Sequence, residues 1–267
     1  MRNFQGWAPV VLIDNFSSDR TVEIARRFTD RIVMHRNPGW GDPESYQVRF
    51  TAAPTDYVLI AYAGQYYPPS LLELYKKIAK EGHYKAVAVW NQVYSYGRAV
   101  NSYGRPFVNN TGAFAFFRKS AIDLNLGKIH SELPFTGSKE DIYYPPKLPE
   151  FCRISFRDDD CASTELKHAR YADADARQQH SAGVRTNLLI MTCTYLRHLL
   201  GCLLWRGAIW QGMPGIINSI WRANYYLSIH IRIWEMQNGY EQTKITSLHA
   251  GIRSKLSKRE QIDVINT

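Results

Sequence analysis

Residues 10–21 read Val-Val-Leu-Ile-Asp-Asn-Phe-Ser-Ser-Asp-Arg-Thr and decide the fold class. The apolar run ends at Asp14, a polar turn follows, and a helical pattern opens at Thr21. α/β proteins use this order to present polar groups to a ligand at the carboxyl edge of a sheet. The turn contains no glycine, so it is not a glycine-rich phosphate cradle, and we expect Asp14 to bind a ribose or base. A simpler interpretation is that Asp14 only closes a strand before a capped helix.

Strand-like and helix-like segments alternate after this turn. Short strands are predicted at 30–34 and 56–62, and helices at 21–28, at 44–53 and from Tyr67 onward. Prolines in the first turn of the last helix are an ordinary start signal. The alternation predicts an α/β fold with a mostly parallel sheet flanked by helices.

At this point the chain resembles glycosyltransferase family 2, in its lipopolysaccharide-core and polysaccharide branch. The matching pieces span roughly residues 8–236 and lie at 10–25, 55–60, 68–72, 112–119, 129–137 and 166–172. The resemblance implies a GT-A nucleotide-sugar-binding fold. Family members begin with a further strand and helix, whereas only Met1–Ala8 precede the first matching strand here. We therefore expect a GT-A-like sheet that is shortened at its N-terminal side.

The acidic Asp-x-Asp-like pair, which binds a divalent metal in the family, is missing. The matching stretch is Ala61-Tyr-Ala-Gly-Gln-Tyr-Tyr. Mg²⁺ and Mn²⁺ prefer oxygen ligands, and Ala63 and Gly64 carry no side-chain oxygen. We expect no metal of the usual kind and no cofactor apart from the nucleoside-diphosphate sugar, which is the donor substrate.

Arginine replaces the metal in this interpretation, because fixed guanidinium groups neutralise the charge of a leaving diphosphate. Arg49 is the preferred candidate, since related enzymes often place a diphosphate-contacting arginine on the helix before the strand. Arg98 is the second candidate, although single arginines are more often solvated surface charges. Asn15 and Ser17 join Asp14 as candidates for the nucleoside end of the donor.

An inverting transfer, which the resemblance implies, needs a base that takes the proton of the acceptor hydroxyl. Glu132 lies where relatives have a His-Glu pair, and Asp141 lies where other members have a Glu-Asp pair. The two rank equally, and either can be an ordinary loop acid. A third acidic group, Asp158–Asp160, is expected to cap a helix.

Residues 185–235 form the second informative region, a predicted pair of apolar helices rich in arginine and tryptophan. Arg197 and His198 stand near the middle of the first helix and argue against a membrane span. Basic, tryptophan-rich amphipathic helices lie in the headgroup layer of anionic membranes. The alternative is a helical hairpin packed on the catalytic domain with its arginines in water.

Length and composition support this organisation. The 267 residues, 45% of them hydrophobic, are enough for one large α/β domain with a helical extension. We expect a nucleotide-sugar-binding domain at 1–150, a helical extension at 151–240 and a polar tail at 241–267. Four cysteines without zinc spacing indicate free thiols in a reducing compartment. With no signal-peptide pattern, we expect a cytoplasmic protein, peripheral at the inner face of the membrane.

The sequence therefore predicts a glycosyltransferase that moves a sugar from a nucleoside-diphosphate sugar to a hydroxyl of a glycolipid or polysaccharide precursor. Two alternatives stay open. The net charge of +9 permits a nucleic-acid partner, as in a viral-type enzyme that glycosylates modified DNA bases. The missing acidic pair and the short start also suit a catalytically dead scaffold that binds a partner.

Overall fold

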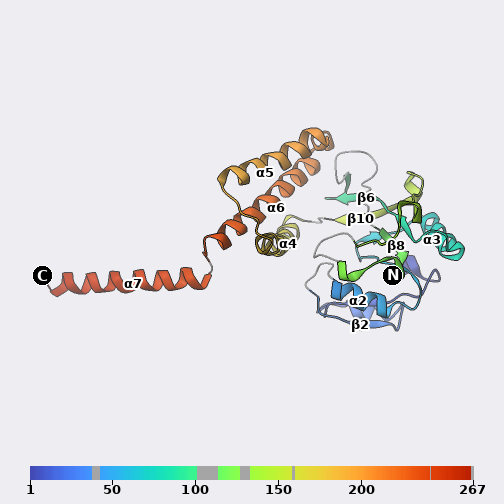
Figure 1. The fold of residues 1–267 in the computed structure, drawn as a ribbon, viewed down its shortest axis with the longest axis horizontal. Coiled ribbons are helices and arrows are strands. Elements are labelled where there is room, and N and C mark those ends of the chain that lie inside the picture. The colour runs from blue at the N-terminus through green and yellow to red at the C-terminus, as the bar shows by residue number, and fades with distance from the viewer. Residues whose placement is uncertain (38–42, 101–113, 127–132, 158–159, 241, 266–267) are drawn as a thin grey trace. The chain divides into compact units, whose positions relative to one another are not determined.

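The structure is a computed structural model of the chain (Figure 1), and it describes residues 1–37, 43–100, 114–126, 133–157, 160–240 and 242–265. The chain divides into two compact units, Met1–Asp159 and Asp160–Thr267. The first unit contains all the strands of the described residues, and the second contains helices alone.

The first unit begins with a parallel strand pair. Strand β1 (Leu12–Asp14) pairs with β2 (Ile32–Met34), and Asp14 lies opposite Met34 at their carboxyl ends. Helix α1 (Thr21–Ala25) connects them, three residues shorter than the predicted 21–28. Backbone hydrogen bonds continue as turns from Arg26 to Thr29, which explains why the helical sequence pattern extends past the helix.

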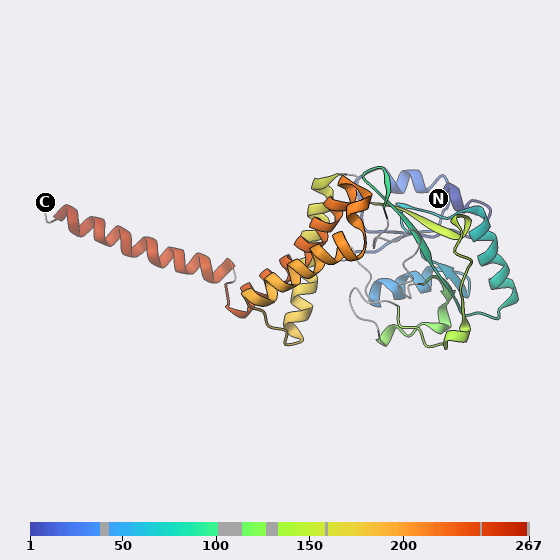
Figure 2. The ribbon, with the colours of Figure 1, turned by 90° about the horizontal axis from the view of Figure 1, so that it is seen from above.

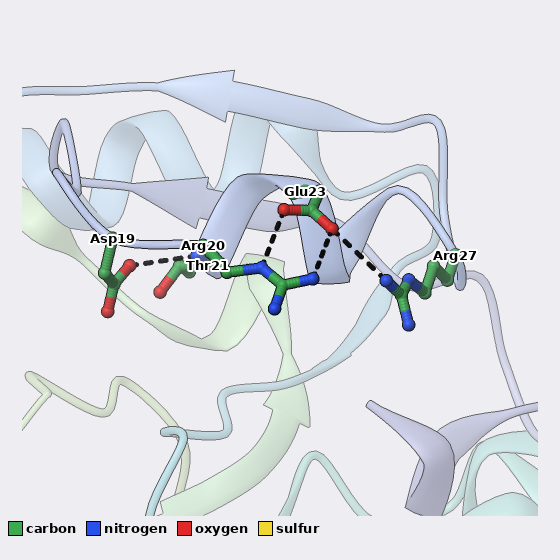
Figure 3. Close-up of polar contacts among 5 residues, drawn as sticks. All are labelled: Asp19, Arg20, Thr21, Glu23 and Arg27. Atoms are coloured by element: carbon green, nitrogen blue, oxygen red, sulfur yellow. Dashed lines mark hydrogen bonds and ion pairs between the residues drawn. The ribbon is translucent and has the colours of Figure 1, made fainter.

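Charged side chains fix the start of α1, as Figure 3 shows. The carboxylate of Asp19 accepts the backbone N–H of Thr21 at 2.9 Å. Arg20 donates two hydrogen bonds of 2.8 Å to Glu23, and Arg27 adds a third of 3.2 Å. The pKa of Glu23 is lowered because these guanidinium groups favour its ionised form.

A second sheet has the strand order β3-β8-β5-β9. Its strands are Tyr57–Leu59, Phe114–Arg118, Ala86–Ala88 and Ile142–Tyr143, in that order. Strand β8 runs antiparallel to both β3 and β5, whereas β9 is parallel to β5.

A third sheet has the order β4-β10-β6-β7. Its strands are Gln65–Tyr66, Cys152–Arg157, Trp90–Ser95 and Arg98–Val100, in that order. Strands β10 and β6 are parallel, and β4 and β7 are antiparallel to their neighbours. The hairpin between β6 and β7 turns at Tyr96 and Gly97, which both have positive φ, 49° and 72°. Positive φ at both central residues is the geometry of a type I′ turn, one of the two common two-residue hairpin connections.

The α/β class is confirmed, but the strands do not form the expected mostly parallel sheet. Among the described strands four pairings are antiparallel and three are parallel. Three features give the antiparallel pairings: the β6–β7 hairpin, the insertion of β8 between β3 and β5, and the pairing of β4 with β10. Alternation of strands and helices along a chain carries no information about such distant pairings.

Two helices cover apolar faces of the first unit. Helix α3 (Pro69–Glu81) starts with proline and ends at Gly82, whose left-handed φ of 69° terminates the helix. Its buried Tyr75 stacks on Phe116 of β8, with ring centroids 4.6 Å apart. Helix α2 (Pro43–Ala52) packs Phe50 against Phe117 of the same strand, at 5.7 Å. Both helices match their predicted positions within two residues.

Single turns of 3₁₀ helix complete the first unit; they are η1 (Arg2–Phe4), η2 (Lys119–Ala121), η3 (Leu124–Leu126), η4 (Lys139–Asp141) and η5 (Pro149–Phe151). The first of them carries Asn3, whose side chain bonds both the N–H and the carbonyl oxygen of Tyr67, at 2.9 Å each. This pair fixes the N-terminal residues to the start of α3.

The second unit contains three packed helical segments and a last helix. The packed segments are α4 (Cys161–Ser181), α5 (Leu188–Leu200) with the π-helix η6 (Gly201–Trp205), and α6 (Met213–Gln237). The 3₁₀ turn η7 (Ala208–Gln211) precedes α6, and the last helix is α7 (Gln242–Ile265). Helices α5 and α6 lie side by side (Figure 1, Figure 2). Ala172 and Ala176 of α4 pack against Ile229 and Ile233 of α6, so small residues permit close helix packing. The predicted helix pair is confirmed.

The domain limits differ from those predicted. The division falls at Asp159 instead of residue 150, because β10 pairs with β6 and so belongs to the first unit. The expected polar tail is helix α7. The predicted acidic cap is confirmed at Asp160, which accepts the N–H of Ser163 at 2.7 Å.

Candidate functional site

The carboxylate of Asp14 is buried at the end of β1, with 2% of the residue exposed. Both of its oxygens accept the backbone N–H of Ser17, at 3.2 and 3.0 Å. This contact closes the turn after the strand, in agreement with the simpler interpretation of Asp14. An ionised carboxylate has about four acceptor positions, so this one N–H leaves acceptor capacity for a ligand.

The turn holds Phe16 in an unusual backbone conformation. Its φ is 57°, in the left-handed region that bulky residues rarely occupy, at a cost of about 1–2 kcal/mol. The ring is exposed, and the guanidinium of Arg36 lies 5.4 Å from its centroid. The Asp14–Ser17 contact stabilises this turn and points an aromatic ring to the surface beside the strand ends.

Asn15 ties the ends of the two parallel strands together. Its side-chain oxygen accepts the N–H of Asn37 at 2.9 Å, and its amide donates to the Asn37 carbonyl oxygen at 3.0 Å. The side chain therefore holds the loop after β2 against the turn after β1. In this arrangement Asn15 has a structural role at the rim of the candidate site.

Two further contacts lead from Asp14 to helix α2. The N–H of His35 donates to the Asp14 carbonyl oxygen at 2.8 Å, and the Nε2 atom of His35 lies 3.4 Å from the hydroxyl of Ser45. Ser45 is buried and stands one helical turn before Arg49. Residues four apart share a helix face, so the side of α2 that meets His35 also carries Arg49.

Arg49 lies beside two tyrosines. Its guanidinium carbon is 4.9 Å from the ring centroid of Tyr46 and 5.9 Å from that of Tyr62. The Nη1 atom is buried and has no hydrogen-bond partner among the described residues. Burial raises the pKa of Tyr46 to about 12, the neighbouring Tyr62 adds to this rise, and Arg49 opposes it. The Tyr46 phenol therefore keeps its proton at neutral pH and stays uncharged beside the Arg49 cation.

A buried N–H without a partner costs about 1–3 kcal/mol, and more when the group is charged. An anionic ligand at Arg49 removes that cost, and phosphate and carboxylate oxygens are the acceptors that match a guanidinium in geometry. The aromatic rings provide a cation–π contact in the absence of the anion. The cluster of Arg49, Tyr46 and Tyr62 can therefore bind an anion without a metal ion.

Packing explains the glycine at residue 64, in the stretch where an acidic pair was sought. Gly64 lies against β10, where the N–H of Phe156 donates to the Gly64 carbonyl oxygen at 2.8 Å. A Cβ atom at residue 64 would be 2.9 Å from the carbonyl oxygen of Phe156, closer than such contacts occur. The residues that the structure describes contain no group of three His, Cys, Asp or Glu side chains suited to a metal ion.

Asp141, one of the two predicted bases, has structural contacts. Its Oδ2 atom accepts the N–H of Ser138 at 2.9 Å in a capping box at η4, and Lys85 lies 3.1 Å from the same atom. The backbone of Ser138 and then the Lys85 ammonium lower the pKa of Asp141. A carboxylate of lowered pKa is a weaker base, which disfavours Asp141 as the catalytic base. Glu132, the other predicted base, lies outside the described residues.

Arg98 stands apart from the candidate site in the chain's topology. It is an exposed residue of β7, the edge strand of the third sheet, whereas Asp14 ends β1 and Arg49 belongs to α2. Sequence reasoning thus found Asp14, Asn15, Ser17 and Arg49, which a short series of contacts connects. It missed their partners, which are His35, Ser45, Tyr46 and Tyr62. For Ser45 the sequence offered one signal, since it stands four residues before Arg49 on a predicted helix and so shares its face.

The comparison with known families adds no assignment, since no protein-family model matches this sequence. The geometry of the described residues therefore carries the argument about the site. Its decisive element is the buried Nη1 atom of the half-buried Arg49, on the helix whose Ser45 lies beside His35, just after β2.

Proposed function

We propose that the protein is a glycosyltransferase that takes a sugar from a nucleoside-diphosphate sugar and passes it to a hydroxyl acceptor without the usual metal ion. The observation that supports it is the buried Nη1 atom of Arg49, which lacks a hydrogen-bond partner among the described residues. An oxygen of the diphosphate would accept that hydrogen bond. The guanidinium would neutralise the negative charge of the diphosphate, as a metal ion otherwise does.

Each candidate residue has a definite role in this proposal. Asp14, beside Asn15 and Ser17, receives the nucleoside, because an acceptor at a strand end suits ribose hydroxyls. Arg49 binds the diphosphate and stabilises the charge that develops as the sugar leaves. Glu132 is the preferred base, since the contacts of Asp141 lower its pKa. The fold would be a shortened, GT-A-like variant, and the acceptor a glycolipid or polysaccharide precursor.

Isothermal titration calorimetry with UDP, GDP, CDP and ADP in EDTA tests the donor site. We expect one of these diphosphates to bind without metal, and Arg49→Ala to weaken its binding at least tenfold. Arg26→Ala, which removes an exposed arginine next to α1, is the matched control and should leave binding unchanged. Binding of no diphosphate, with or without Mn²⁺, would contradict the proposal.

A screen of nucleotide sugars for slow hydrolysis, read by mass spectrometry, tests catalysis separately and identifies the nucleotide. The expected product is one nucleoside diphosphate, whose release stops in Arg49→Ala. Asp141→Asn should retain hydrolysis if Glu132 is the base. Loss of activity in Asp141→Asn with intact diphosphate binding would instead assign the base to Asp141.

The second candidate function is a non-catalytic nucleotide-binding protein. It is favoured by the structural contacts of the two candidate acids that the structure describes. Asp14 bonds Ser17, and Asp141 contacts Ser138 and Lys85. This candidate predicts diphosphate binding that depends on Arg49 but no hydrolysis of any donor. The two measurements above therefore separate an enzyme from a binding protein.

A further inference from the structure

We propose that α5, η6 and η7 form a surface that docks on an anionic lipid bilayer and lies in its headgroup layer. We call this the docking surface; it comprises Leu189, Leu196, Leu200, Leu204, Trp205 and Trp210. The inference concerns the second unit alone and does not depend on sugar transfer. Its failure would leave the proposed donor site untouched.

The docking surface is apolar and exposed. Trp205 is 85% exposed, Trp210 88% and Leu204 64%. The four leucines recur at spacings of seven and four residues, which places them on one face of the continuous helix formed by α5 and η6. Soluble monomers rarely leave large contiguous apolar patches in water, so this face requires an apolar partner.

The charge around this surface has one sign. Arginine stands at 185, 197, 206, 222 and 232, and no acidic residue occurs between Arg185 and Glu235. His198 stacks on Tyr226, and the guanidinium carbon of Arg222 lies 5.5 Å from the centroid of the same ring. Burial first, and then Arg222, Arg197 and Arg206, lower the pKa of His198 to about 4. Positive charge beside an apolar face complements a bilayer that contains anionic lipid, because each surface arginine attracts negative headgroups.

One described helix segment, Leu188–Trp205, has the length and the apolar composition of a membrane span. Two observations favour a position along the membrane surface. Arg197, at mid-length, is costly at the centre of a bilayer. The other face of α5 packs on α6, where His198 stacks on Tyr226 at 3.7 Å. Exposed tryptophans at the end of the helix are typical of headgroup-level anchors.

Flotation of the full chain with liposomes tests the proposal. We expect binding to vesicles of phosphatidylcholine with 30% phosphatidylglycerol, and at least tenfold weaker binding to pure phosphatidylcholine. The double variant Trp205→Ser with Trp210→Ser should reduce binding to the anionic vesicles at least tenfold. Arg197→Gln, exposed on the same helix, should also weaken binding and reduce its dependence on salt.

The matched control is Leu166→Asp, which changes a leucine of α4 that is 74% exposed and lies outside the docking surface. It should bind as the unchanged protein does. Circular dichroism and thermal unfolding check that each variant is folded. Leu204→Asp gives a second way to disrupt the surface if the double tryptophan variant does not fold.

Three outcomes would overturn the proposal. The first is no flotation, or equal flotation with the two vesicle types. The second is quenching of tryptophan fluorescence more strongly by lipids brominated deep in the chain than near the headgroup, which indicates a membrane span. The third is a concentration-dependent dimer that Trp205→Ser with Trp210→Ser abolishes, which assigns the surface to a second copy of the chain.

Discussion

Asp14 links the two interpretations of the turn after β1. Its carboxylate is buried and bonded to the N–H of Ser17, so it stabilises the turn whether or not a ligand is bound. The same contact maintains the positive φ of Phe16. A single residue can thus serve the local structure and a ligand, because a carboxylate has several acceptor positions.

Replacement of Asp14 tests its structural role. Asp14→Ala leaves the N–H of Ser17 without its acceptor, and we expect the free energy of unfolding to decrease by about 1–3 kcal/mol. Asp14→Asn keeps an acceptor oxygen and should cost less. Urea denaturation measures both, and an unchanged free energy of unfolding in Asp14→Ala would show that the hydrogen bond is unimportant.

Gly64 is the residue whose replacement tests the packing at the missing acidic pair. In Gly64→Ala, the new Cβ atom meets the Phe156 carbonyl oxygen at 2.9 Å, and we expect a loss of about 1–3 kcal/mol in stability. Gly251→Ala in α7, which has open space around it, should be neutral or slightly stabilising. Similar thermal unfolding of both variants would refute the close contact.

Short elements with local signals were predictable from the sequence, and the way they pair was not. Helix α3 was located by its prolines, and Asp160 by its position before a helix. Strand β8 lies within the piece at 112–119 that resembles the family, but its place between β3 and β5 depends on contacts far apart in the chain. Helix α7 was missed because its polar sequence resembles a mobile tail.

The candidate site shows the same limit. Strand-end and helix positions identified Asp14 and Arg49, because an acid after an apolar run and a cation on the next helix are local features. The side chains that connect them, His35 and Ser45, belong to different elements and meet only in the folded chain. The positive φ of Phe16 has no signal in the sequence, since glycine or asparagine is the usual residue in that conformation.

The capping box of η4 makes the stability of the fold depend on pH in the acidic range. The pKa of Asp141 is lowered below its ordinary value of 3.8 by Ser138 and Lys85, so its stabilising effect is present above that value and disappears as the pH falls further. We expect Asp141→Asn to be less stable than the unchanged protein at pH 6. The difference should shrink between pH 4 and pH 2 in chemical denaturation, and a constant difference would contradict this.

His198, at the contact between α5 and α6, makes stability depend on pH over a higher range than Asp141 does. Burial, then Arg222, Arg197, Arg206 and His230, lower the pKa of His198 to about 4, from an ordinary value of 6.5. The unfolded chain therefore binds a proton between these values that the folded chain does not, and stability decreases as the pH falls from about 6.5 to about 4. His198→Gln should flatten this decrease in thermal unfolding.

His249→Gln is the control for that experiment, because His249 is exposed on α7. We expect it to unfold with the same dependence on pH as the unchanged protein. Burial also lowers the pKa of His230, so His230 contributes to the same dependence of stability on pH. The double variant His198→Gln with His230→Gln should therefore show the weakest dependence. An unaltered slope in that double variant would show that these histidines do not control acid stability.

Considered as a whole, the chain combines a mixed α/β unit with a basic helical unit. The first carries the site at Arg49, and the second carries the docking surface. If both proposals hold, the net charge of +9 serves binding to phosphates in two settings, a nucleoside diphosphate and a lipid headgroup. Salt should then weaken liposome binding more than diphosphate binding, because surface charges are screened more than buried ones.

The central claim is that the guanidinium of Arg49, whose Nη1 atom is buried, binds a diphosphate in place of a metal ion. A crystal structure of the protein with its preferred nucleoside diphosphate, grown in EDTA, tests this most directly. We predict a phosphate oxygen within hydrogen-bond distance of Nη1 of Arg49, and the ribose near Asp14. A structure in which the diphosphate lies elsewhere, or in which protein side chains occupy the space beside Nη1, would contradict the claim.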